Sequence, residues 1–427
     1  MRVAAALPEG RHVLNACSDR YRFTIAFAAS LVANKVSLLP STHTPEVIRQ
    51  LTEFAPDVFC LTDDARCQID LPRVRFPDAA APAPGEGRGC DVAGAQPSSW
   101  QPVQIETDRL AAYVFTSGST GTPLPYKKTW GRLVNCVRFE AERLGLLDGR
   151  PHAIVGTVPP QHMYGFESTV LLALQSGNAF SAGRPFYPAD VCSELASVPQ
   201  PRMLVATPVH LRTLLAADVH LPPVDLVLSA TAPLSQNLAR EAEQRFETRL
   251  LEIYGSTETG QIATRRTAQT VEWQLFSGVR LVSEAEQTWA EGGHVEQPTP
   301  MCDVLEITTH DRFLLHGRQS DLVNIAGKRS SIAYLNHQLN AIPGVLDGAF
   351  FVREEDESSS TGVTRVAALV VAPNLDAAAV TEQLRKRIDP VFLPRPLLFV
   401  EALPRNDTGK LPHEALLSLA VNAMKRA

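Results

Sequence analysis

The sequence lacks the features of a secreted, membrane-spanning or nucleic-acid-binding protein. Only seven of its 427 residues are cysteine, and none has the Cys-x-x-Cys spacing of a zinc site, so neither a disulfide framework nor a zinc centre is expected. No apolar run is long enough to cross a bilayer, and residues 1–7 are too short for a signal peptide. The net charge of -6 argues against nucleic-acid binding. We therefore expect a cytoplasmic protein with reduced thiols.

What the sequence does contain is an alternation of helical and strand-like patterns. Residues 45–54 have apolar side chains at helical spacing, and residues 57–61 follow as a short apolar run typical of a buried strand. The alternation continues with strand 111–115, helix 189–198, strand 203–206, a helix from Pro208, strand 224–228, helix 234–246 and strand 250–253. This pattern predicts an α/β fold in which helices cover largely parallel sheets.

The C-terminal hundred residues have a different pattern, in which two helices and three strands form a small α+β unit. They are helices 332–340 and 377–388 and strands 345–352, 365–372 and 397–400. The length of the chain also fits more than one domain. We therefore expect a large N-terminal domain at residues 1–319 and a small, separate C-terminal domain at residues 320–427.

The most distinctive motif is a run of small and hydroxyl residues after the strand expected at 111–115. It comprises Thr116, Ser117, Gly118, Ser119, Thr120 and Gly121. Backbone N–H groups in a glycine-containing turn form a concave site for anions, and hydroxyls add donors for phosphate oxygens. The run is not a Walker A loop, because no Gly-Lys-Ser/Thr sequence closes it. A phosphate-binding loop and a polar surface turn both fit these residues.

Three further motifs place charged side chains next to glycine. Residues 254–260 (Tyr-Gly-Ser-Thr-Glu-Thr-Gly) follow a strand-like run, and the carboxylate of Glu258 suits a hard cation that bridges phosphates. Residues 317–329 begin with Gly-Arg, and residues 404–410 end on Lys410, whose ammonium can reach a ligand as a point charge. Taken singly, each of these motifs also fits a surface turn with solvated charges.

Together, in this order and spacing, the four motifs resemble the core motifs of the adenylate-forming superfamily. This superfamily includes acyl- and aryl-CoA synthetases, the adenylation domains of nonribosomal peptide synthetases and firefly luciferase. The resemblance extends from residue 15 to residue 410. It implies the adenylate-forming enzyme fold, activation of a carboxylic acid with ATP and Mg2+, and transfer of the acyl group to a thiol.

The resemblance implies how each motif would bind ATP. The phosphates would lie on residues 116–121, the adenine against Tyr254, and Mg2+ on Glu258, with Thr257 near the phosphate. Asp303 matches the carboxylate that holds the ribose hydroxyls, although an ordinary strand-edge aspartate also fits this position. The other implied nucleotide contacts are Ala232, Pro233, Gly255 and Arg318.

Lys410 matches the lysine that contacts both the attacking carboxylate and the phosphate. Two anions approach each other in this step, so a cation and a metal ion are needed to offset their repulsion. In the superfamily the C-terminal domain rotates between the two half-reactions. Ser320 matches the hinge of that rotation, and the loop containing Gly327 would then line the thiol tunnel.

One departure from the superfamily pattern follows the phosphate loop directly. Relatives usually have Pro-Lys-Gly where residues 123–125 of this chain are Pro-Leu-Pro, so the lysine is absent. Lys127 or Lys128 could supply the charge instead. A non-catalytic, adenylate-binding relative is therefore an alternative, but the retention of the metal-binding glutamate, the motif arginine and Lys410 argues against it.

The resemblance also places an acid pocket near His162. Its walls would be His162, Tyr164, Gly165, Ser229, Ala230 and Gly255. A packed structural histidine fits position 162 equally well. No acidic residue stands where amino-acid activators hold a substrate amine, which disfavours an amino acid as the substrate.

The compact length, the opening residues 15–23 and the substitution at Leu124 look most like one group of ligases. These are the stand-alone 3-hydroxybenzoate:acyl carrier protein ligases of aryl-polyene and xanthomonadin pigment biosynthesis. We therefore expect an aromatic acid, 3- or 4-hydroxybenzoate, and transfer to the phosphopantetheine of an acidic acyl carrier protein. Basic residues of the C-terminal domain could meet that protein, although solvated helix faces also explain them. They are Arg385, Lys386, Arg387, Lys425 and Arg426. The alternative is an aryl- or medium-chain acyl-CoA ligase that uses free CoA.

Overall fold

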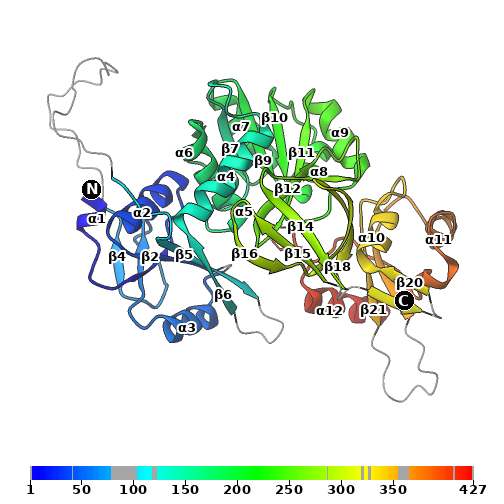
Figure 1. Ribbon diagram of the computed structural model, residues 1–427. Coiled ribbons are helices and arrows are strands. Elements are labelled where there is room, and N and C mark those ends of the chain that lie inside the picture. The colour runs from blue at the N-terminus through cyan, green and yellow to red at the C-terminus, as the bar shows by residue number, and fades with distance from the viewer. Residues whose placement is uncertain are drawn as a thin grey trace.

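The computed structural model describes residues 2–40, 42–77, 103–117, 123–285, 287–318, 322–325, 328–353, 365–406 and 409–425. Figure 1 shows an N-terminal sheet, a larger central sheet and a small C-terminal unit following one another along the molecule. Helices cover the sheets, so the predicted α/β class is confirmed.

The N-terminal sheet has six strands in the order β4-β3-β1-β2-β5-β6. Its pairs are parallel except for β5 and β6, which form an antiparallel hairpin at one edge. The strands are β1 (His12–Asn15), β2 (Val36–Leu39), β3 (Phe59–Thr62), β4 (Arg73–Arg75), β5 (Leu110–Ser117) and β6 (Pro123–Thr129). The helices are α1 (Arg2–Ala5), α2 (Arg20–Val32) and α3 (Pro45–Phe54). The predicted phosphate loop connects the two strands of the hairpin.

The central sheet has nine strands in the order β17-β18-β13-β12-β11-β10-β9-β7-β8. Its parallel strands are β7 (Ala153–Gly156), β8 (Ala179–Phe180), β9 (Arg202–Ala206), β10 (Leu226–Ser229) and β11 (Leu250–Ser256). Its antiparallel strands are β12 (Gly260–Arg265), β13 (Trp273–Leu275), β17 (Asp303–Thr309) and β18 (Arg312–Arg318). The sheet is therefore mixed. The expectation of largely parallel sheets does not hold for its part formed by β12, β13, β17 and β18.

Helices between the parallel strands cover the central sheet. They are α4 (Trp130–Leu144), α5 (Met163–Gly165), the π-helix η1 (Phe166–Leu171), α6 (Leu172–Ser176), α7 (Pro188–Ser197), α8 (Pro208–Ala216) and α9 (Gln236–Phe246). A separate three-stranded antiparallel sheet contains β14 (Val279–Glu284), β15 (Gln287–Gly292) and β16 (Val295–Pro300).

The C-terminal unit has a three-stranded sheet with helices and a short hairpin. Its strands are β19 (Leu322–Ile325), β20 (Lys328–Ser331), β21 (Asp347–Arg353), β22 (Arg365–Val371) and β23 (Leu397–Phe399). Its helices are α10 (Ile332–Asn340), α11 (Ala377–Arg385), the 3-10 helix η3 (Pro390–Phe392) and α12 (His413–Met424). Buried side chains pack on both faces of its sheet, as expected for a small α+β unit. The predicted boundary between residues 319 and 320 lies outside the described residues.

Capping residues explain where the predicted elements begin. Helix α3 begins at Pro45 because the Thr44 hydroxyl accepts the N–H of Val47 and Pro45 fits the first turn. Helix α9 begins two residues later than predicted, because Ser235 caps it through the N–H of Leu238. Strand β3 likewise begins at Phe59 instead of residue 57.

Residue 57 stays outside strand β3 because its carboxylate is used in another way. The Asp57 oxygens accept the backbone N–H of Arg11 at 2.6 Å and contact His12 Nδ1 at 2.6 Å. These bonds tie the start of β1 to the turn before β3. An aspartate in a turn next to a strand end is a common arrangement.

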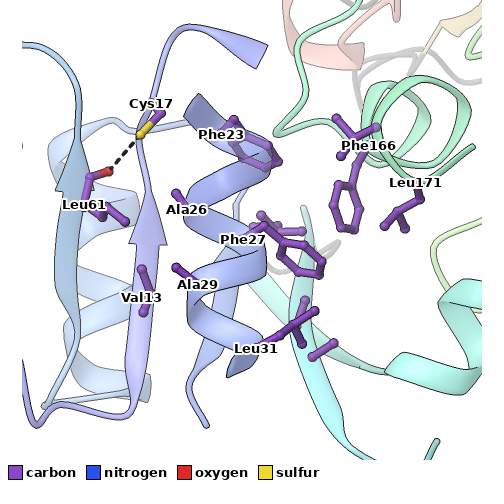
Figure 2. Close-up of a cluster of buried hydrophobic side chains, with 14 of the residues drawn as sticks. Val13, Cys17, Phe23, Ala26, Phe27, Ala29, Leu31, Leu61, Phe166 and Leu171 are labelled. Atoms are coloured by element: carbon purple, nitrogen blue, oxygen red, sulfur yellow. Dashed lines mark hydrogen bonds between the residues drawn. The ribbon is translucent and has the colours of Figure 1, made fainter. Parts of the chain in front are cut away.

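The N-terminal and central sheets share a hydrophobic core. Figure 2 shows Phe23 and Phe27 of α2 facing Phe166 and Leu171 of η1, all of them buried. The rings of Phe27 and Phe166 meet edge to face, with centroids 4.8 Å apart and an interplanar angle of 77°. Aromatic pairs in this geometry add to the stabilisation from buried area.

A buried arginine also connects the two sheets. Arg20, only 1% exposed, donates from its guanidinium to the carbonyls of Gly156, Val158, Ser181 and Gly183. These carbonyls lie on or beside strands β7 and β8, whereas Arg20 begins helix α2. Burial is the main cause that lowers the pKa of Arg20, to about 10, so the side chain remains a cation at neutral pH.

Arg20→Met is expected to lower the free energy of unfolding by about 3–5 kcal/mol, because four carbonyls would lose a charged donor. Urea unfolding followed by circular dichroism measures this. The control is Arg22→Met on the same helix, where an exposed guanidinium lies 3.6 Å from Asp63 and the expected loss is about 1 kcal/mol or less. Equal losses in both variants would contradict the role given to Arg20.

The six cysteines in the described part of the chain are all free thiols. Burial raises the pKa of the Cys60 thiol to about 12 and raises that of Cys136 as well. Neither thiol therefore has the character of a nucleophile. Among the described residues no helix is both long and apolar enough to cross a membrane.

Candidate active site

A cleft of about 430 Å³ separates the central sheet from the C-terminal unit. On the side of the central sheet it is lined by Thr231, Ala232, Pro233, Asp303 and Gly317, among others. On the opposite side it is lined by residues that include Asp347, Arg405, Gly409 and Lys410. The cleft therefore brings together four residues that the sequence motifs predicted for one site: Ala232, Pro233, Asp303 and Lys410.

Tyr254 and Asp303 meet at this end of the central sheet. The Tyr254 hydroxyl donates to Oδ2 of Asp303 at 2.5 Å. The ring is packed beside Trp273 and Phe313, with centroids 5.5 and 5.6 Å away. Asp303 is also the register partner of Arg318 in the β17–β18 ladder. The residues predicted to hold adenine and ribose are thus neighbours.

Tyr254→Phe is expected to raise the KM for ATP about fivefold while kcat changes by less than about twofold, because one hydrogen bond to a charged group is lost. Initial rates at varied ATP measure this. Tyr334→Phe is the control, since Tyr334 is exposed, its hydroxyl donates to the Arg387 carbonyl, and the residue does not line the cleft. A similar rise in the control would contradict the assignment.

The turn between β11 and β12 carries the predicted Thr257 and Glu258. The turn is closed by its own side chains: Ser256 N donates to the Thr259 hydroxyl at 3.2 Å, and Thr259 N donates to the Ser256 hydroxyl at 3.1 Å. Before it, Gly255 cannot be replaced, because an added Cβ would lie 2.3 Å from the Gly260 carbonyl oxygen. The Glu258 side chain is partly exposed.

The two lysines that could replace the missing one lie in different environments. Lys128 is only 1% exposed, and its ammonium donates to the Thr257 carbonyl. It therefore lies beneath the turn, and this burial argues against a role for it in the phosphate loop. Lys127 is exposed on β6, so that alternative stays a prediction.

Lys410 lies close to His162. Burial and then the Lys410 charge lower the pKa of His162 to about 4, so the imidazole is neutral at pH 7. His162 caps α5 by accepting the N–H of Tyr164 on Nδ1 at 3.3 Å. Gln161 fixes the same loop by donating to the Cys17 carbonyl at 2.9 Å.

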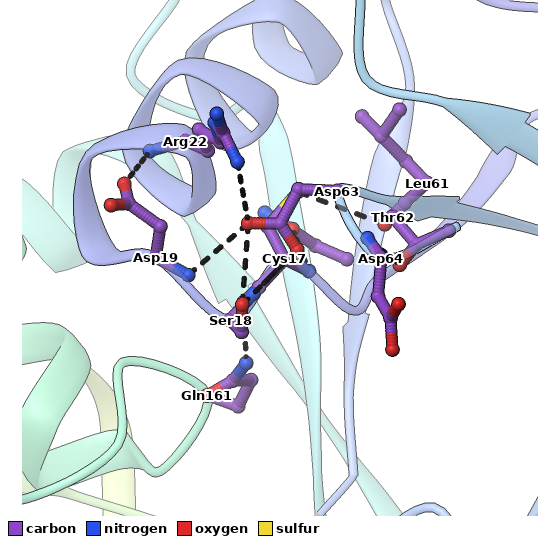
Figure 3. Close-up of polar contacts among 10 residues, drawn as sticks. Cys17, Ser18, Asp19, Arg22, Leu61, Thr62, Asp63, Asp64 and Gln161 are labelled. Carbon is purple, nitrogen blue, oxygen red and sulfur yellow. Dashed lines mark hydrogen bonds and ion pairs between the residues drawn. The ribbon is translucent and has the colours of Figure 1, made fainter. Parts of the chain in front are cut away.

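The Cys17 carbonyl belongs to the segment that precedes α2, which a polar network holds in place. Figure 3 shows Asp63 facing the start of the helix. Its carboxylate accepts the N–H groups of Ser18 at 3.0 Å and Asp19 at 3.3 Å, and the Ser18 hydroxyl. The predicted residues 15–23 therefore support the His162 loop from the N-terminal sheet.

An ion-pair chain holds the Lys410 loop against the central sheet. Arg212 of α8 lies 3.5 Å from Asp347, and Asp347 accepts Arg405 Nε at 2.7 Å. Arg405 also donates to the Gly409 carbonyl at 2.9 Å. Gly409 itself packs on Val209 of α8, where an added Cβ would lie 3.1 Å from a methyl group. Sequence reasoning missed Arg212 and Asp347, which lie in no motif.

Three residues predicted for the acid pocket have structural contacts instead. Tyr164 is buried, and its hydroxyl donates to the carbonyls of Ala206 at 3.1 Å and Leu228 at 3.0 Å. At Gly165 an added Cβ would lie 2.1 Å from the Pro159 carbonyl oxygen, and Ser229 is fully buried. None of the three lines the cleft described above, and their role in an acid pocket stays a prediction.

Several predicted residues lie beyond what the structure describes. Gly118, Ser119, Thr120 and Gly121 of the phosphate loop and the hinge residue Ser320 fall outside the described residues. For Thr116, Ser117 and Arg318 only the backbone is placed, in β5 and β18. Their roles stay predictions.

The donors around the cleft fit magnesium-bound ATP. The described residues contain no group of three or more His, Cys, Asp or Glu side chains arranged to hold a metal. Glu258 would therefore be a single carboxylate ligand, and Mg2+ is often bound in this way, by one or two carboxylates together with phosphates and water. Asp303 offers acceptors for hydroxyl groups, and Lys410 offers a cation for phosphate.

The comparisons with known proteins give one family model and several similar proteins. The sequence model described as AMP-binding enzyme matches residues 2–307. The chain is 29% identical over 299 residues to a 4-coumarate--CoA ligase of Rhodobacter capsulatus, which covers 69% of this chain and 73% of the relative. It is 30% identical over 307 residues to a 4-coumarate--CoA ligase of Halorhodospira halophila, with the same two shares. The ATP-bound structure of MatB from Rhodopseudomonas palustris has a TM-score of 0.78 at 18% identity and covers 98% of this chain and 91% of that chain.

Proposed function

This chain belongs to the AMP-binding enzyme family, and from that premise we propose that it activates an aromatic carboxylic acid with ATP and transfers the acyl group to CoA. It is an AMP-forming acid–thiol ligase. In the first step a carboxylate oxygen attacks the α-phosphorus of ATP and the bond to pyrophosphate breaks. In the second step the thiolate attacks the acyl carbon and AMP leaves.

One observation carries the proposal, namely the convergence of Asp303, Ala232, Pro233 and Lys410 in a single cleft. Asp303 and Tyr254 would hold the nucleoside, and Lys410 would contact the attacking carboxylate and the phosphate. The neighbouring His162 is neutral, so it adds no charge beside an acid that must be ionised to attack. Glu258 and Thr257 would hold the magnesium-bound phosphates.

The identity of the acid rests on weaker support. Two similar proteins are named for 4-coumarate, which is an aromatic acid, and this supports an aromatic substrate. The neutral imidazole of His162 could pack against such a ring without requiring a charged partner on it. Within this class 3- or 4-hydroxybenzoate is our specific proposal.

The acceptor differs from the one expected from the sequence. The similar curated proteins are named as CoA ligases, so CoA replaces an acyl carrier protein as our first choice. Two of the basic residues predicted to contact a carrier protein already have partners within this chain. Lys386 pairs with Glu382 at 2.8 Å, and Arg387 donates to Gln383 at 2.7 Å. Arg426 lies outside the described residues.

Pyrophosphate release with ATP and Mg2+ across a panel of acids tests the reaction. The panel contains benzoate, its hydroxylated forms, cinnamates, fatty acids and amino acids. We expect release only with aromatic acids, and thioester formation with CoA in the second half of the experiment. Release with fatty acids alone would contradict the aromatic assignment, and a thioester formed only on phosphopantetheinylated carrier protein would contradict CoA as the acceptor.

A moving C-terminal unit is part of the same proposal. In the present arrangement Lys410 faces the cleft, which is the arrangement needed for adenylation. Rotation about Ser320 would withdraw Lys410 and bring the loop with Gly327 to the thiol. Crosslinking the unit in the present arrangement should allow pyrophosphate release and block thioester formation.

A further inference from the structure

Two cations, one from the N-terminal hairpin and one from the helix that follows it, lie beneath the turn that carries Thr257 and Glu258. Lys128 comes from β6, the edge strand of the six-stranded sheet, and its ammonium donates to the Thr257 carbonyl. Arg132 comes from the first turn of α4, and its guanidinium donates to the Glu258 carbonyl. Each of the two site residues is therefore held through its backbone by one cation.

The turn does not need these cations in order to close. Ser256 and Thr259 already exchange two hydrogen bonds across it, at 3.1 and 3.2 Å. Bonds from Lys128 and Arg132 instead connect the turn to β6 and to the start of α4. They fix the position of the turn relative to these two elements.

Burying a lysine ammonium costs desolvation free energy, so a buried lysine indicates a specific role for the charge. Burial and the neighbouring Arg132 lower the pKa of Lys128, whereas Glu167 opposes this. Glu167 is itself buried, and Cys136 Sγ donates to its Oε1 at 3.6 Å. An apolar side chain would occupy the same space without a desolvation cost. What an apolar side chain cannot do is hold a carbonyl.

We infer that Lys128 and Arg132 are positioning residues for the magnesium-bound phosphates: they hold the Thr257–Glu258 backbone from below so that both side chains meet the ligand. This inference rests on the proposed adenylation reaction. The cations act through the turn, since each bonds to a backbone carbonyl and neither lines the cleft. Their charges face Glu167, so the net charge beneath the turn is partly balanced.

The loss of either cation should weaken metal binding more than it weakens folding. In Arg132→Met and Lys128→Met we expect the Mg2+ concentration for half-maximal pyrophosphate exchange to rise at least about tenfold, because Glu258 would no longer be fixed. Arg132→Lys keeps a cationic donor and should stay within about threefold of the unmodified protein. Arg138→Met is the matched control, since Arg138 is exposed on the same helix. We expect no change there beyond about twofold.

Three outcomes would overturn the inference. The first is an unchanged or lower Mg2+ requirement in both Lys128→Met and Arg132→Met. The second is a loss of kcat or of thermal stability at an unchanged Mg2+ requirement, which is what a purely structural role predicts. The third is an Arg132→Met protein that does not fold. Arg132 is only partly buried, so this variant provides the test if Lys128→Met is unstable.

A second readout separates this inference from the proposed reaction. This readout is the protection that ATP gives against thermal unfolding, measured as a function of Mg2+ concentration with no acid present. It reports on the binding of magnesium-bound ATP at the turn without requiring a reaction. If the unmodified protein releases no pyrophosphate with any acid, the proposed reaction fails. The four variants are then compared by this protection, and the tenfold shift is expected for Lys128→Met and Arg132→Met but not for Arg132→Lys or Arg138→Met.

Discussion

Replacing Lys410 by alanine is expected to reduce acid-dependent pyrophosphate exchange by about a hundredfold or more, which corresponds to about 3 kcal/mol in the barrier. The ammonium offsets the repulsion between the attacking carboxylate and the phosphate, and this repulsion is largest in the transition state. Its loss should therefore appear in kcat more than in the KM for ATP. Exchange of labelled pyrophosphate into ATP, with the acid that the panel selects, measures the effect.

Lys386→Ala is the matched control, because Lys386 lies in the same unit and its ammonium is paired with Glu382 on the surface. A second readout tests the placement of Lys410 directly. Its charge lowers the pKa of His162, so removal of the charge should raise that pKa. Burial is the larger cause and remains, so the pKa should stay below the ordinary value of about 6.5. An unchanged His162 titration, followed by NMR, would argue against the proximity.

Glu258→Gln is the second substitution with a large expected effect. The amide keeps the shape of the side chain but removes the charge that a hard cation prefers in its ligands. We expect the exchange rate to fall about a hundredfold or more, with at most partial recovery at high Mg2+. Titration with Mg2+ at saturating ATP separates a weaker metal site from a slower chemical step.

Glu272→Gln is a suitable comparison, since Glu272 lies 3.7 Å from Arg312 in an ion pair next to β13. Its substitution should change the rate by less than about twofold. If Glu258→Gln keeps the full rate at ordinary Mg2+, the metal is held by other groups and the assignment of Glu258 is wrong.

The sequence predicted the parallel part of the fold well because local signals mark each element there. Pro45, Pro188 and Pro208 open helices α3, α7 and α8, and short apolar runs mark the buried strands between the helices. The antiparallel strands lack such signals. Strand β17 is largely exposed along its length, and β16 contains two prolines, so neither has the pattern of a strand.

In the candidate site, too, local motifs predicted individual residues, whereas contacts between distant segments could not be predicted. Motifs predicted Tyr254 and Asp303 separately, but their hydrogen bond depends on β11 and β17 lying in one sheet. The partnership of Arg212 with Asp347 joins two ordinary residue types across the cleft, and no local pattern marks either of them. Lys128 was noticed for its charge, whereas its burial beneath a distant turn could be seen only in the folded chain.

The connection made by Arg20 has a consequence for how the molecule comes apart. Its guanidinium and the Phe27–Phe166 contact both join helix α2 to segments of the central sheet. The first sheet can therefore not open without exposing polar and apolar surface of the second. Amide hydrogens of β1 and β9 should exchange with deuterium in one cooperative event, and Arg20→Met should split that event in two. In the unmodified protein the N-terminal folding unit would therefore include both the first sheet and the central sheet. The two sheets would have to be expressed together to fold.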